Sequence, residues 1–288
     1  MYPSWEEQLC SALLALLPRR IFFDLIVSGE IPVRSFMENH YAQIQNLARR
    51  IVAGYPLPEF YKDYASAVIY SKKILETNPL LVKIRSFVSK NLDNDFGHGL
   101  DHAIKVTLDA GALIFIESKI AGYSDSFYNR RVIIAQSAGL MHDIKRKEKD
   151  HSEAGATFAR EALKDCSFLP EELDDICTAI KNHEAFKNTV ETKTPEGKLI
   201  SDCLYDADKF RWGPDNFTDT FWEMISYINP PFSEFIALYP KGMESLHKIK
   251  LTFRSETGKK YGPGFIDIGI AIGEELFEII KKDFAYLL

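Results

Sequence analysis

The stretch AGLMHDIKRK, residues 138–147, carries the features from which the fold and a site can be predicted. Its first half continues the apolar segment that begins at residue 127, and the pattern predicts a helix in the centre of the core. That helix ends in His142 and Asp143, which basic residues follow. Burying an imidazole beside a carboxylate is costly unless both have a strong partner. A metal ion is one such partner.

The rest of the chain also has helical rather than strand periodicity. A helix is predicted to begin near Ser4, and the residues from Tyr261 to Gly264 are predicted to form a loop before a long C-terminal helix. Further helices are predicted around 34–53, 58–76, 100–119, 151–166, 169–186 and 194–210. The sequence therefore predicts an all-α protein.

Composition excludes several classes of function. The 288 residues are 46% hydrophobic and carry a formal net charge of -6, which argues against a general nucleic-acid binder. The sequence contains no apolar run of the roughly 18–20 residues that a membrane span requires, and Glu6 and Glu7 do not favour a signal peptide. Four cysteines without a CxxC pair indicate reduced thiols. We expect a soluble cytoplasmic protein.

Four of the seven histidines fall at the ends of predicted helices: His102, His142, His151 and His183. A single histidine in a helical protein is more often an ordinary core or surface residue. The pattern is more specific when His102, the His142-Asp143 doublet and an aspartate near residue 208 occur in order across otherwise apolar helices. Imidazole and carboxylate ligands together are typical of a metal site.

Residues 85–215 resemble the HD superfamily of metal-dependent phosphohydrolases. The stretches that carry this resemblance are HGLDHAIKV, AGLMHDIKRK, DHSEAGATFAREAL, AIKNHEAF and DADKF, and they occur in the family's order. The resemblance implies an HD-type helical bundle whose primary metal is held by His102, His142, Asp143 and Asp208. It selects Asp208 rather than Asp206 because the family's aspartate directly precedes a basic or polar residue, here Lys209.

The resemblance leaves a second ion open. His151 and His183 match histidines that hold a second ion in two-metal members, where the doublet aspartate bridges the two. In this chain the segment between the doublet and His151 is short, and Glu184 stands where many such members have a second consecutive histidine. His98 matches an upstream histidine that is usually not a ligand. We expect one divalent ion (Mn, Fe, Ni, Co, Zn or Mg), with a second ion undecided.

The implied reaction is hydrolysis of a phosphate ester by a metal-activated water. Asp143 or Asp208 is a candidate to orient that water, and Lys209, which follows a ligand directly, is the strongest candidate to assist at the phosphate. The candidates for substrate binding are Lys105, Arg146, Lys147 and Lys209. For most charges of residues 145–151 the favoured interpretation is a solvated loop.

The leading hypothesis is a phosphomonoesterase or phosphodiesterase that acts on a nucleotide or another small phosphorylated metabolite. An HD-type di-iron oxygenase is the first alternative, because its six ligands follow the same order; a regulatory binding module with a structural metal is the second. We expect residues 81–288 to form the HD-type domain and residues 1–80 a helical accessory region. A homodimer is left open.

Overall fold

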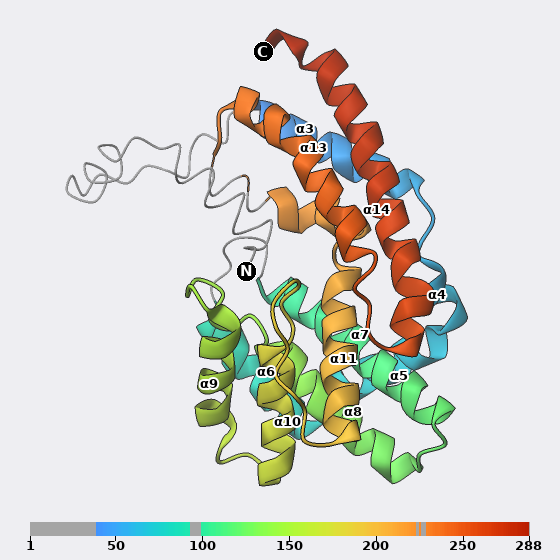
Figure 1. Cartoon of the computed structure of the whole chain (residues 1–288), viewed down its shortest axis with the longest axis vertical. Coiled ribbons are helices and arrows are strands. Elements are labelled where there is room, and N and C mark those ends of the chain that lie inside the picture. Colours follow the sequence, from blue (N-terminus) through green and yellow to red (C-terminus); the bar gives the residue numbers. More distant parts are fainter. Residues whose placement is uncertain (1–38, 93–98, 223–224, 226–228, 288) are drawn as a thin grey trace, which may run out of the picture.

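The computed structural model describes residues 39–92, 99–222, 225 and 229–287. The helix predicted near Ser4 and the upstream His98 lie outside these residues. Every regular element within the described ranges is a helix, which confirms the all-α prediction (Figure 1).

The longer helices in chain order are α3 (Asn39–Gly54), α4 (Glu59–Asp63), α5 (Ala65–Thr77), α6 (Pro79–Asn91), α7 (Leu100–Ile120), α8 (Asp125–Met141), α9 (His151–Leu163), α10 (Pro170–Lys181), α11 (Pro195–Phe210), α13 (Phe232–Ile249) and α14 (Glu256–Asp283). A π-helix, η1, spans Asn216–Thr220, and a short 3-10 turn, η2, spans Ala285–Leu287. Figure 1 shows α13 and α14 side by side at the opposite end of the molecule from α9 and α10.

Helices α7 and α8 form the centre of the fold. Two glycines allow them to approach closely: a Cβ added to Gly139 would lie 2.8 Å from Thr107 Oγ1, and one added to Gly111 would lie 2.8 Å from Gln136 Nε2. The last ten residues of α8 are nearly all buried, because neighbouring helices cover the helix on every side. This packing holds the end of α8, where the His-Asp doublet follows, inside the protein.

The helices before residue 80 share the core with the rest of the chain. Helix α5 packs on α7, where the Ser71 hydroxyl donates to the Leu108 carbonyl over 2.7 Å. The Gln136 side chain on α8 in turn donates to the Ser71 carbonyl over 2.8 Å. Phe60 of α4 and Tyr41 of α3 are also buried in the same hydrophobic cluster.

The predicted loop over Tyr261–Gly264 was wrong, because α14 runs through this segment without interruption. Ser255 caps the helix earlier by accepting a hydrogen bond from the Gly258 amide at 2.9 Å. Gly262 serves packing rather than a turn: a Cβ at this position would lie 2.5 Å from the Phe253 ring. Pro263 is accommodated inside the helix.

Candidate metal centre

Five helix ends converge on one buried cluster of histidines and aspartates. His102 lies in the first turn of α7, and His142 follows the last residue of α8. His151 is the first residue of α9, and Asp208 lies in the last turn of α11. His183 follows α10 by two residues. Side chains at helix ends can leave the packed faces, and here all of them are buried where the ends meet.

The first group consists of His102, His142 and Asp208. The two imidazole Nε2 atoms are 3.3 Å apart, and Asp208 Oδ1 lies 3.3 Å from the His102 Nε2 and 3.8 Å from the His142 Nε2. Three potential ligand atoms therefore face one point between α7, α8 and α11.

The second group consists of Asp143, His151 and His183. The His151 and His183 Nε2 atoms are 3.3 Å apart. Asp143 Oδ1 lies 3.6 Å from the first of these nitrogens and 3.3 Å from the second. This group brings the start of α9 and the end of α10 against the doublet.

Asp143 stands between the two groups. While its Oδ1 faces the second group, its Oδ2 lies 3.4 Å from His142 Nε2 and 3.8 Å from His102 Nε2. One carboxylate thus presents a different oxygen to each set of imidazoles. This is the geometry in which an aspartate can bridge two cations.

Backbone carbonyls fix which ring nitrogens face the centre. His142 Nδ1 lies 2.7 Å from the Gly139 carbonyl, and His183 Nδ1 lies 2.6 Å from the Ile180 carbonyl. A carbonyl only accepts, so Nδ1 carries the proton in both rings, and the Nε2 lone pair points at the centre. Such outer hydrogen bonds are how proteins orient histidines that bind metals.

The chemistry of these donors fits a divalent cation. The converging atoms are imidazole nitrogens and carboxylate oxygens at 3.3–3.8 Å from one another, buried where several lone pairs would otherwise repel. Burial alone raises the pKa of Asp208, but Lys209, His102 and His142 outweigh it and hold the pKa well below its usual range. Burial lowers the pKa of His142, yet Asp143 and Asp208 raise it overall. The site therefore favours charge on its carboxylates.

A pocket lined mainly by charged and polar side chains opens onto this centre. Its walls include His102, Asp143, His183 and Asp208, together with Arg146, Lys209, Arg211 and Trp212. Phe186 also lines it, 45% exposed and with a φ of 63° that non-glycine residues seldom adopt.

The predicted phosphate-binding residues are not equally placed. Lys209 is buried, and its Nζ donates to Asp208 Oδ2 over 2.6 Å at the pocket wall. Arg146 lines the same pocket. Lys105 is not among the lining residues, and its Nζ donates to Asp215 Oδ1 over 2.9 Å. Lys147 is exposed and also outside the lining.

Sequence reasoning missed a buried network around Arg211. This guanidinium, on the pocket wall, donates to the Asp109 carboxylate, to the Tyr61 hydroxyl over 2.7 Å and to Asp215. Tyr61 in turn donates to Asp109 over 2.8 Å. Burial raises the pKa of Asp109 to about 6 although Arg211 opposes the shift. The available signal was that Asp109 lies seven residues after His102, on the same side of α7.

The other aspartate of the DAD sequence faces away from the centre. Asp206 accepts hydrogen bonds from the Arg254 and Ser255 amides, both over 2.8 Å, and from the Ser255 hydroxyl over 2.7 Å. It therefore ties α11 to the start of α14. A Cβ at Gly258 would lie 1.9 Å from its Oδ2, so glycine is required there.

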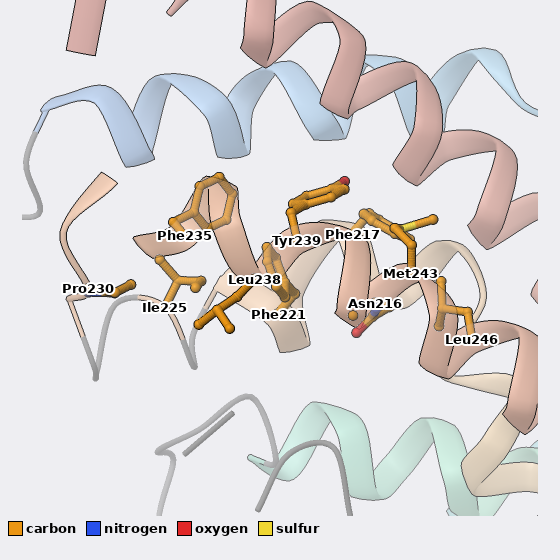
Figure 2. A pocket seen from close by; sticks show the side chains of 11 residues that line it. Asn216, Phe217, Phe221, Ile225, Pro230, Phe235, Leu238, Tyr239, Met243 and Leu246 are labelled. Atoms are coloured by element: carbon orange, nitrogen blue, oxygen red, sulfur yellow. The ribbon is translucent and has the colours of Figure 1, made fainter. Parts of the chain in front are cut away.

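A second pocket is apolar (Figure 2). Its walls come from α13, η1 and the residues after η1, and none of the described residues that line it is acidic or a histidine. Tyr239 is one of these, and its hydroxyl donates to the Gly273 carbonyl over 2.8 Å. Asn216 of η1 lines both pockets, so the two pockets share a wall residue.

A helical fold that buries histidines and aspartates beside a pocket is the arrangement of a protein with a candidate metal site. Residues 100–211 match the HD domain family, and this range includes all six candidate ligands. The chain therefore contains an HD domain at residues 100–211. Comparison with curated proteins and with solved structures gives no match. No helix in the described ranges is long and apolar enough to cross a membrane.

Proposed function

We propose that this protein is a metal-dependent phosphomonoesterase or phosphodiesterase whose substrate is a nucleotide or another small phosphorylated metabolite. The observation that carries the proposal is Asp143, whose two oxygens face two imidazole groups beneath a pocket lined by Lys209, Arg146 and Arg211. A pocket that combines carboxylates with cationic side chains suits a phosphate group approaching a metal.

The residues that would hold a first ion are His102, His142, Asp143 and Asp208. A second ion would use Asp143, His151 and His183, and the proximity of these three side chains raises our expectation of two ions. When bound, a divalent ion lowers the pKa of a coordinated water and neutralises charge on a phosphoryl group. Mn, Fe, Ni, Co, Zn and Mg all remain candidates.

The side chains around the ligands have separate proposed tasks. Asp143 holds and orients the attacking water through a carboxylate oxygen. Lys209 and Arg146 donate to the phosphate oxygens of the substrate, because both reach the pocket wall. Lys105 and Lys147 lie outside the lining, so we assign them to the attraction of an anionic substrate rather than to contact.

An HD-type di-iron oxygenase is the second candidate. The specific observation in its favour is that the six ligand candidates form two adjacent groups that share Asp143, as a dinuclear centre requires. Oxygen consumption by iron-loaded protein would distinguish it from a hydrolase. A regulatory module with a structural metal predicts neither reaction.

Other sequence-based expectations stay predictions. We propose the division into a helical accessory region, 1–80, and an HD-type domain, 81–288, and we place the protein in the cytoplasm. We also propose that the protein forms a homodimer, which analytical sedimentation would test.

The experiment is a hydrolysis screen on metal-free protein reloaded with each of the six metals. The substrates are nucleotides, phosphorylated sugars and a nitrophenyl phosphate monoester and diester. We expect metal-dependent product release that His142→Ala and Asp143→Ala abolish. His247→Ala is the matched control, because this histidine is exposed on α13. Absence of turnover with every metal would contradict the proposal.

A further inference from the structure

Arg146 contacts the second ligand group through a ligand atom itself. Its Nη1 lies 2.8 Å from His151 Nε2 and 4.0 Å from Asp143 Oδ1. The Arg146 side chain is 20% exposed, and a turn in which the Arg146 amide donates to the Asp143 carbonyl over 2.9 Å directs it back over the site.

This contact occupies the lone pair with which His151 Nε2 would coordinate a metal ion. Guanidinium nitrogens only donate, so the Arg146 N–H points at the lone pair of His151 Nε2. The same Nε2 lies 3.3 Å from His183 Nε2 and 3.6 Å from Asp143 Oδ1, as a member of the second group. One lone pair cannot accept a proton donor and coordinate an ion at once.

The first group has a different relation to its nearby cation. Lys209 donates to Asp208 Oδ2, whereas Oδ1 is the oxygen that lies 3.3 Å from His102 Nε2. An ion at the first group therefore does not need to displace Lys209. An ion at the second group must displace Arg146.

We infer that Arg146 competes with the second ion for His151, so that the two ions bind with unequal affinity and the second binds only when the guanidinium swings away. The displaced side chain stays within reach of the pocket that it already lines. This inference rests on the proposed second metal group, and it makes Arg146 a residue that controls metal occupancy.

The test is a titration of metal-free protein with Mn²⁺ alone, in which calorimetry measures binding. Metal analysis after desalting then gives the number of ions that stay bound. The wild type is compared with Arg146→Ala and Arg146→Gln. Lys149→Ala is the matched control, because it removes a positive charge from an exposed position in the same loop. The His151→Ala variant identifies the weaker site, since this variant must lack the weaker of the two sites that the wild type shows.

We expect two classes of site in the wild type. A hydrogen bond from a charged donor is worth enough that its loss should tighten the weaker site by roughly tenfold to a hundredfold in both Arg146 variants. The stronger site and Lys149→Ala should change little. This readout is independent of activity.

Each of the following results would overturn the inference. The weaker site could be unchanged or weakened in the Arg146 variants, or Lys149→Ala could tighten it equally, which would make the effect one of general charge. Loss of the stronger site in both Arg146 variants would instead show that Arg146 is needed for metal binding at both groups. If the wild type binds no metal, the proposed function fails as well; if it binds one ion and both Arg146 variants also bind one, only this inference fails.

Discussion

Replacing Asp206 by alanine tests the division of labour between the two aspartates of the DAD sequence. Asp206 is fully buried, and its carboxylate accepts three hydrogen bonds at the start of α14. The alanine variant would leave the Arg254 and Ser255 amides without this acceptor. It would also release the Ser255 hydroxyl, which caps α14.

The expected loss of stability follows from these contacts. Each buried donor left without a partner costs about 1–3 kcal/mol, and a weakened N-cap adds about 1 kcal/mol. We therefore expect Asp206→Ala to lower the free energy of unfolding by about 3–5 kcal/mol. Urea unfolding followed by circular dichroism, with a chelator present, measures this difference without a contribution from bound metal.

Two comparisons make the test specific. Asp202→Ala removes an acid from the same helix, but this carboxylate pairs with Lys198, which is well exposed, so the loss should stay below about 1 kcal/mol. Asp206→Ala should still bind metal at both ligand groups, whereas Asp208→Asn should lose the ion of the first group. A loss for Asp206→Ala no larger than that for Asp202→Ala would refute the reasoning, and so would loss of metal from stably folded Asp206→Ala.

Three further outcomes are expected. The Asp143→Asn variant should bind neither ion tightly and lose more than about 100-fold in kcat/KM, because one carboxylate serves both groups. Metal analysis that finds the wild-type metal content in this variant would contradict the prediction. Arg211→Met should lower the free energy of unfolding by about 3–5 kcal/mol, since it leaves the Asp109 carboxylate buried without its cation; a change below about 1 kcal/mol in urea unfolding would count against the network. Burial raises the pKa of Asp206 from its ordinary value of 3.8 to about 6, so the folded protein holds this proton more tightly than the unfolded chain does. Its contribution is full below pH 3.8 and is lost as the pH rises through about 6, so the stability difference between the wild type and Asp206→Ala should be larger at pH 4 than at pH 7.5.

Helix boundaries were predictable where local chemistry sets them. Thr194 accepts from the Gly197 amide over 3.0 Å and Pro195 follows, so α11 begins within one residue of the start predicted at residue 194. The segment around Tyr261 misled because glycine and proline usually mark loops. There, tight packing against Phe253 requires a glycine at position 262, and only the tertiary structure reveals this.

The resemblance to the HD superfamily implied the six candidate ligands as a set, because the family's segments occur here in order. The structure brings all six within two adjacent groups. Their arrangement was not predictable, since the position of Asp143 between the groups depends on how α7, α9, α10 and α11 meet. The contact between Asp109 and Arg211 joins residues 102 positions apart, each of which looks like an ordinary surface charge in the sequence.

The most direct test of the metal centre is metal analysis together with anomalous diffraction from crystals of the reloaded protein. We predict an anomalous peak among His102, His142, Asp143 and Asp208, and a weaker one among Asp143, His151 and His183 when metal is in excess. Protein that binds no divalent metal after reloading, or peaks only at other positions, would contradict the central claim.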